Sequence, residues 1–268
     1  MVTKSDISLV RSLADKRSRE ECGLFVVEGR KMVQEALASG FRVERVFATA
    51  EAAKALAVCS GGDNSVRGRA ATSEITTVSV KEMERLSLLR TPSDTLALVA
   101  IEKAALTSTA NGLILALDDV QDPGNVGTII RLADWFGIGD VVCSPATADC
   151  YAPKVVQATM GAIFRVRVHY TPLAQWLAAQ RAPVFGTFME GENVYTATLL
   201  QSAVIVMGNE GRGITPAVEA AVTRRLAIPP FPPQPSGVGE ERRGSESLNV
   251  AIATAIICSE FRRRGLHV

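Results

Sequence analysis

The chain has little of what metal sites and disulfide frameworks require. It holds only two histidines, His169 and His267, and its five cysteines are scattered without a CxxC pair. Zinc sites need clustered cysteine and histidine ligands, and disulfide scaffolds use paired cysteines. We therefore expect no resident metal, no disulfide framework and no serine–histidine–aspartate triad. His169 is interpreted as a polar residue at a strand end rather than a general base.

The chain also lacks a long apolar run. The longest, around residues 250–258, is far shorter than the roughly 20 residues needed to cross a bilayer. Residues 1–6 contain no apolar signal core, so the sequence predicts a cytoplasmic protein without a membrane partner. A hydrophobic content of 47% with 21% charged residues over 268 residues is typical of a soluble globular protein with one large or two ordinary domains.

A large net charge of either sign is absent as well. The formal charge of +1 neither indicates nor excludes a nucleic-acid partner, because local clusters matter more than totals. Cations gather early in the chain, where they are mixed with acids, and again at residues 262–264. Each cluster is as consistent with a solvated helix face as with nucleic-acid contact. Arg17, Arg30 and Lys31 are the candidates for contact in the first cluster.

Residues 1–105 alternate helical and strand patterns and predict a small α/β domain. The predicted helices are 5–14, 30–38, 80–89 and one ending at 54–58, and the predicted strands are 24–27, 43–48 and 95–101. Residues 60–68 are rich in turn formers and predict a loop. Residues 106–112 are small and polar, which is typical of a linker between domains.

Residues 113–268 form a second α/β unit in which strands and helices alternate. Strands are predicted near 113–117, 141–142, 166–168, 184–188, 204–207 and 226–228, and helices near 126–135, 154–160, 173–179, 216–221 and 248–263. Such alternation favours a mainly parallel sheet that is covered by helices on both faces.

A polar, glycine-containing turn at residues 118–127 leaves a strand and enters a helix. Such a turn presents free N–H groups and the positive end of the helix dipole to an anion. Arg131 lies six residues after Asn125 along this helix. The turn lacks G-x-G-x-x-G spacing, and Asp140 and Asp149 are poorly placed to bind a ribose. A nucleotide-dependent oxidoreductase is therefore only an alternative.

Two further turns share this character. Residues 207–214 follow the apolar strand 203–206 and hold three glycines within six positions, which permits close backbone approach to a ligand. The third turn combines residues 226–229 with residues 247–251. Its Ser247 and Asn249 are also good helix-start residues, although a helix start alone does not explain their occurrence with the other two turns.

Together the three turns resemble the three motifs of the SpoU, or TrmH-type, RNA ribose methyltransferases of the SPOUT superfamily. The resemblance implies S-adenosylmethionine as cofactor and an RNA ribose 2′-hydroxyl as the methyl acceptor. It also implies an α/β catalytic domain over residues 113–268, with a mainly parallel sheet and a C-terminal trefoil knot. The site of such enzymes is assembled in a homodimer.

The resemblance assigns roles to residues at the matching positions. Arg131 is the central catalytic residue, and the side chains around it are Asn125, Glu210, Ser247 and Asn249. The implied cofactor-binding residues are Thr187, Gly208, Asn209, Gly211, Ile228 and Leu248. A guanidinium is a poor proton acceptor, so we favour electrostatic stabilisation over a base role for Arg131. Glu210 is expected to hold Arg131 or neighbouring donors in place.

The N-terminal domain carries a second resemblance. Residues 23–29, followed by Val33 and residues 35–37, resemble an RNA substrate-binding domain similar in fold to ribosomal protein L30e. That likeness makes ribosomal RNA the preferred substrate over transfer RNA. Lys154, in a segment that also resembles the family, is a further candidate for RNA contact. An inactive RNA-binding protein of the same fold is an alternative, against which the intact site residues argue.

Residues 230–246 depart from the family pattern, because this stretch is about ten residues longer than we expect. Its prolines, glycines and charges predict a solvated loop. We expect either a mobile flap near the methyl donor or a tolerated surface insertion.

Thr187 also has two interpretations. It is either a residue near the cofactor, as the resemblance implies, or an ordinary β-branched strand residue.

Overall fold

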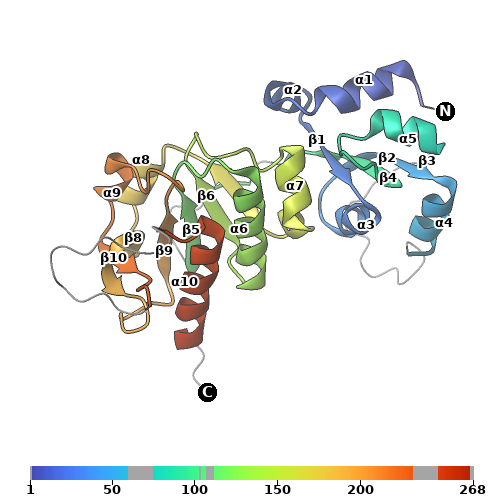
Figure 1. The fold of residues 1–268 in the computed structure, drawn as a ribbon. Helices are drawn as coiled ribbons and strands as arrows, with labels where there is room; N and C mark the ends of the chain where they lie inside the picture. The colour runs from blue at the N-terminus through green and yellow to red at the C-terminus, as the bar shows by residue number, and fades with distance from the viewer. Residues whose placement is uncertain (1, 60–74, 103, 107–111, 232–246, 266–268) are drawn as a thin grey trace. The chain divides into compact units, whose positions relative to one another are not determined.

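The computed structural model describes residues 2–59, 75–102, 104–106, 112–231 and 247–265 (Figure 1). The predicted loop at 60–68, most of the predicted linker and most of the 230–246 insertion lie outside the described residues. Contacts divide the chain into two compact units. The first holds residues 1–103 with 149–165, and the second holds residues 104–148 with 166–268. The domain boundaries predicted from sequence stay a prediction.

The first unit is built around a mixed four-stranded sheet. Its elements are α1 (Lys4–Ser12), α2 (Lys16–Cys22), β1 (Leu24–Glu28), α3 (Arg30–Ala38), β2 (Val43–Thr49), α4 (Ala50–Cys59), β3 (Ile75–Val78), α5 (Val80–Leu86), β4 (Thr95–Ala100), α7 (Pro153–Thr159) and the 3₁₀ helix η2 (Ala162–Phe164). The strand order is β1-β4-β2-β3, with β4 antiparallel to both its neighbours and β2 parallel to β3.

The core of the first unit lies between this sheet and its helices. On one face, Val10 and Leu13 pack with Phe47 and Leu98 and with residues of α5. Segment 149–165 joins the unit through Phe25, whose ring centroid lies 4.7 Å from that of Tyr151. The buried guanidinium of Arg19 fixes the start of the segment, because its Nη2 donates to Asp149 Oδ2 at 2.6 Å.

The second unit contains a six-stranded sheet in which every pairing is parallel. Its elements are β5 (Leu113–Leu117), α6 (Pro123–Trp135), β6 (Asp140–Cys143), β7 (Arg167–Tyr170), α8 (Leu173–Ala178), β8 (Val184–Asn193), β9 (Ala203–Met207), α9 (Pro216–Glu219), β10 (Arg224–Ala227) and α10 (Val250–Gly265). The strand order is β10-β8-β9-β5-β6-β7. The mainly parallel α/β sheet predicted from sequence is confirmed.

Both faces of the central strands are covered, which is why β5 and β9 are apolar and buried throughout. On one face, Ile114 and Val204 pack with Leu173 of α8 and Val218 of α9. On the other, α6 and α10 lie side by side (Figure 1). The side chain of Arg262 joins their ends, because its Nε donates to the carbonyl of Phe136 at 2.7 Å.

Most elements fall where the sequence predicts them, and α3 has the predicted bounds. The sequence interpretation missed α2 and β3, because α2 is short and almost wholly polar and β3 has only four residues. The apolar face of α10 packs within the unit, as a core helix does, and Phe261 contacts Phe185 edge to face at 5.2 Å between centroids. The trefoil knot stays a prediction. No helix among the described residues has the length and apolar character to span a membrane.

Candidate active site

The first predicted turn starts α6 at the carboxyl end of β5. Asp122 caps the helix, because its Oδ1 accepts the backbone N–H of Asn125 at 2.8 Å, and Pro123 occupies the first helical position. The helix therefore begins three residues before the predicted start. This capping places the Asn125 side chain, which is half-buried, at the carboxyl edge of the sheet, where ligands bind in open parallel sheets.

Hydrogen bonds join the three predicted turns through Asn125. Its Nδ2 donates to Glu210 Oε1 at 2.8 Å, and its Oδ1 accepts from Asn249 Nδ2 at 2.9 Å. The three residues are separated by 85 and 124 positions along the chain. The structure thus brings together three of the five side chains that the sequence assigned to catalysis.

The direction of this chain of hydrogen bonds is fixed by α10. Asn249 Oδ1 accepts the backbone N–H groups of Ala251 at 2.9 Å and Ile252 at 3.2 Å, as an N-cap does. Its amide nitrogen must then face Asn125 Oδ1, which turns the Asn125 nitrogen toward Glu210. The positive end of α10 is thereby connected to a carboxylate through two oriented amides.

The second predicted turn approaches its own backbone closely. A Cβ atom on Gly208 would lie 2.4 Å from the carbonyl carbon of Gly213 and 2.5 Å from the nitrogen of Ile214, so only glycine fits. Asn209 and Gly213 exchange two backbone hydrogen bonds of 2.9 Å. The Asn209 Oδ1 also accepts the N–H of Gly211 at 2.9 Å, which closes residues 209–213 into a tight loop.

Two aspartates support this loop, and the sequence interpretation gave neither a role. Asp118 is buried and its Oδ2 accepts the N–H of Thr215 at 2.7 Å. Asp119 adopts a left-handed backbone with φ of 56°, and its carbonyl accepts from Asn209 Nδ2 at 2.8 Å. The available signal was the pair of acids directly after a buried apolar strand, where ionised side chains are kept only if they are hydrogen-bonded.

Arg131 stands apart from the hydrogen-bonded group. It is exposed, and its side chain makes no hydrogen bond or ion pair within the described part of the chain. Six residues at 100° each place Arg131 about 120° around α6 from Asn125, so the two side chains leave the helix in different directions. Glu210 accordingly holds Asn125, the neighbouring donor, rather than Arg131. Ser247 is exposed and likewise outside the group.

The remaining cofactor candidates lie around the same edge of the sheet. Thr187 is half-buried in β8, and its Oγ1 donates to the carbonyl of Val206, two residues before Gly208, at 3.0 Å. Ile228 follows β10, and Leu248 precedes α10 and is 50% exposed. The backbone groups of Ile228 and Leu248 make no hydrogen bond to other described residues, so they are available to a ligand.

The four candidates for RNA contact belong to the first unit. Arg17 on α2 pairs with Glu21 at 2.7 Å, and Arg30 pairs with Asp94, so carboxylates offset both charges. The hydrogen bond that Arg30 donates to Asp94 is the main reason that the pKa of Arg30 is raised. Lys31 and Lys154 are exposed. Their role in RNA binding stays a prediction.

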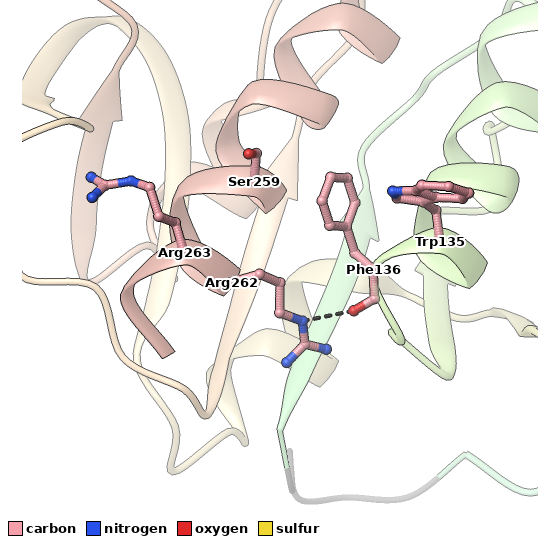
Figure 2. A pocket seen from close by; sticks show the side chains of 5 residues that line it. All are labelled: Trp135, Phe136, Ser259, Arg262 and Arg263. Atoms are coloured by element: carbon pink, nitrogen blue, oxygen red, sulfur yellow. Dashed lines mark hydrogen bonds between the residues drawn. The ribbon is translucent and has the colours of Figure 1, made fainter. Parts of the chain in front are cut away.

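A pocket of about 450 Å³ lies at the far end of α6 from Asn125. Figure 2 shows the residues around it, which are Trp135, Phe136, Ser259, Arg262 and Arg263. Asn125 and Trp135 are ten residues apart on one helix, which corresponds to about 15 Å of rise. This pocket is therefore distinct from the hydrogen-bonded group of Asn125, Glu210 and Asn249.

The chain matches the model of the SpoU rRNA Methylase family over residues 112–259, which is more than half of its length. The chain belongs to this family. The matched region contains every residue of the candidate active site. Residues 4–97 match a second model, the MRM3-like substrate binding domain. The two resemblances predicted from sequence, to the SpoU methyltransferases and to a substrate-binding domain, are thereby confirmed.

Related proteins cover nearly the whole chain. A 23S rRNA (guanosine(2553)-2′-O)-methyltransferase of Bacillus subtilis is 29% identical over 94% of both chains. A solved TrmH-family structure from Porphyromonas gingivalis is 38% identical, with a TM-score of 0.82, and the match covers 98% of this chain and 99% of that one. A solved AdoMet-bound rRNA methyltransferase from Sinorhizobium meliloti is 25% identical with a TM-score of 0.81, over 99% and 97% of the two chains.

Proposed function

We propose that this SpoU family protein transfers a methyl group from S-adenosylmethionine to a ribose 2′-hydroxyl in RNA. The observation that carries the proposal is the hydrogen-bonded chain from Asn249 through Asn125 to Glu210. It joins all three motif turns at the carboxyl edge of a parallel sheet. An inactive relative would have no need to keep these three polar side chains oriented at an exposed edge.

The residues present fit the cofactor. The tight loop at 208–213 and the available backbone groups of Ile228 and Leu248 supply donors and acceptors of the kind that recognise a purine ring. Leu248 adds an exposed apolar side chain beside them. When bound, S-adenosylmethionine supplies an already activated methyl group on a sulfonium, so the protein must orient and partly deprotonate the attacking hydroxyl.

In this proposal Arg131 stabilises the alkoxide that develops on the ribose oxygen and binds the adjacent phosphate. An exposed guanidinium without a carboxylate partner in the described chain is available for both contacts. Asn125 and Asn249 are positioning residues for Glu210, because their amides fix the place of its carboxylate. Ser247, two residues before Asn249 in the chain, is exposed and offers a hydroxyl to the substrate in this proposal.

Ribosomal RNA is the proposed substrate in preference to transfer RNA. The supporting observations are the substrate-binding module at residues 4–97 and a relative, named as a 23S rRNA 2′-O-methyltransferase, that matches this chain over 94% of both lengths. The first unit offers exposed cations for such a partner, Lys31 and Lys154 among them.

We propose further that the protein acts as a homodimer through α6 and α10. Two large apolar side chains on these neighbouring helices are exposed, Trp135 at 83% and Ile252 at 55%. Burying them against a second copy would remove apolar area from water. Such pairing would also allow the exposed Arg131 of one protomer to approach the site of its partner.

The test uses purified protein, tritiated S-adenosylmethionine, and unmodified 23S rRNA and tRNA transcripts. Label in the 23S transcript, recovered as an alkali-resistant dinucleotide, is the expected result, because only a 2′-O-methyl group blocks alkaline cleavage. Label in the tRNA alone would overturn the substrate assignment. Tight cofactor binding without label in either RNA would favour the inactive RNA-binding alternative.

A further inference from the structure

The first unit contains a buried carboxylate with no part in the active site. Glu28, the last residue of β1, is 2% exposed. Its Oε2 accepts from Ser87 Oγ at 2.6 Å, and its Oε1 accepts the backbone N–H of Leu88 at 2.7 Å. Burial raises the pKa of Glu28, although both hydrogen bonds act in the opposite direction. The carboxylate is kept despite this desolvation cost, and it holds two hydrogen-bond donors of another segment of the unit.

What Glu28 holds is the loop of residues 87–94, which connects α5 to β4. The loop begins at Ser87 and Leu88 on the Glu28 carboxylate, and it ends at Asp94, which pairs with Arg30. Gly29 donates its backbone N–H to the carbonyl of Thr95 at 3.1 Å. Both ends of the loop are therefore tied to the turn formed by residues 28–31. Gly29 has φ of 104°, a conformation that favours glycine.

The turn and the loop each carry one cation without a counter-charge. Lys31 and Arg90 are exposed, and neither makes an ion pair or side-chain hydrogen bond with the described residues. Most of the other described arginines of this unit have a carboxylate partner, for example Arg45 with Asp6 and Arg165 with Glu35. An arginine without a partner keeps its full capacity to bind a phosphate.

We propose that the turn 28–31 and the loop 87–94 form a phosphate-binding surface for the RNA, in which Lys31 and Arg90 contact backbone phosphates and Glu28 positions them. This inference rests on the proposed function for the identity of the RNA. It deepens that function, because it places one contact surface of the substrate-binding unit. Glu28 touches no substrate and acts by holding the loop that carries Arg90 against the turn that carries Lys31.

Salt dependence of RNA binding tests the two cations. For the variant Lys31→Ala/Arg90→Ala, we expect the Kd for a 23S rRNA transcript to rise about tenfold. The slope of log Kd against log salt concentration should fall by about 1.5, since each phosphate contact contributes roughly 0.7–0.9. Turnover at saturating RNA and the affinity for S-adenosylmethionine should not change. Lys81→Ala, which removes an exposed cation from α5, should leave the slope unchanged.

An unchanged slope in the double variant would overturn the proposal. Loss of slope in Lys81→Ala to the same extent would do so as well, because the effect would then be one of total charge. If the wild-type protein binds S-adenosylmethionine but methylates no RNA, the proposed function fails. The salt slope of RNA binding still decides the surface in that case, so the two failures are distinguishable.

The positioning role of Glu28 needs a separate pair of variants. Glu28→Gln keeps the size of the side chain, can accept from Leu88 and can donate to Ser87 Oγ, so KM for the RNA should stay near the wild-type value. Glu28→Ala loses both contacts and should raise KM several-fold with little change in kcat. A folded Glu28→Ala protein with normal KM would refute the role. If that variant does not fold, the double variant at Lys31 and Arg90 still tests the surface.

Discussion

The amide nitrogen of Asn125 donates to Glu210 Oε1 at 2.8 Å, across 85 residues of sequence. The bond has one permitted direction, because the amide oxygen of Asn125 is already occupied by Asn249. A residue chosen only for size or polarity at position 125 would not reproduce it. Position 125 therefore requires a donor that faces Glu210 and an acceptor that faces Asn249, which the two ends of one amide supply.

Asn125→Asp should therefore reduce turnover strongly, because it sets a carboxylate against Glu210 while changing neither size nor shape. Adding Glu210→Gln should restore about tenfold of the loss, since the glutamine nitrogen can donate to the new aspartate. Steady-state kinetics of the two single variants and the double variant measure this coupling. Strictly additive losses would show that the bond has no functional role.

Arg131→Ala should abolish transfer, with turnover reduced by a factor of about 10³ or more, if Arg131 stabilises the developing alkoxide. The affinity for S-adenosylmethionine, measured by calorimetry, should remain within about twofold. Stability should barely change, because the side chain is exposed and has no partner among the described residues. Arg131→Lys is the matched control for charge without the planar guanidinium. Near-normal turnover in Arg131→Ala would refute the assignment.

Gly208→Ala and Gly211→Ala form a matched pair in one loop. A Cβ on Gly208 meets backbone atoms at 2.4 Å and 2.5 Å, whereas a Cβ on Gly211 has its nearest neighbour at 3.8 Å. We expect Gly208→Ala to distort the loop and weaken S-adenosylmethionine binding by more than tenfold. Gly211→Ala should bind within about twofold of the wild type. Equal affinities would mean that the loop does not hold the cofactor.

Asp140 should contribute stability that depends on pH. Burial raises its pKa, but hydrogen bonds from Arg167 at 2.7 Å and 2.6 Å and from His169 at 2.9 Å outweigh this effect and lower the pKa below 3.8. Because the folded state favours the ionised form, the stabilisation is present above the unfolded pKa and is lost as pH falls through the lowered folded pKa.

Asp140→Asn should accordingly lower the free energy of unfolding at pH 7 by about 1–2 kcal/mol. The difference from wild type should shrink below pH 3.8, the unfolded value. Urea denaturation at several pH values measures it. A difference that stays constant down to the acid limit would show that charge on Asp140 is not responsible.

Trp135→Ala should weaken self-association, which sedimentation velocity at several protein concentrations would measure. Trp135 is 83% exposed beside α10, and a large aromatic side chain is a common anchor of an interface. Met189→Ala removes an exposed apolar side chain, 56% exposed, from β8 and is the control. A wild-type protein that sediments as a monomer would remove the basis for the proposed homodimer.

Much of this protein follows from local sequence. Asp122 and Pro123 start α6, and alternating apolar strands with intervening helices determine a covered parallel sheet, because these signals act over a few residues. The three glycine-rich and polar turns were recognisable as one site only by their resemblance to a family. Residues 23–29 likewise indicate a substrate-binding domain from sequence alone.

Tertiary structure alone decided which of the site residues touch. The sequence placed Asn125, Glu210 and Asn249 in one site, but only the fold orients their amides, because the cap of α10 fixes Asn249 and the rest follows. The fold also places Arg131 on another face of α6. It brings the carboxylate of Glu28 into hydrogen-bond contact with the loop of residues 87–94. Hydrogen bonds between residues more than 50 positions apart depend on how strands and helices assemble, and no local pattern encodes that assembly.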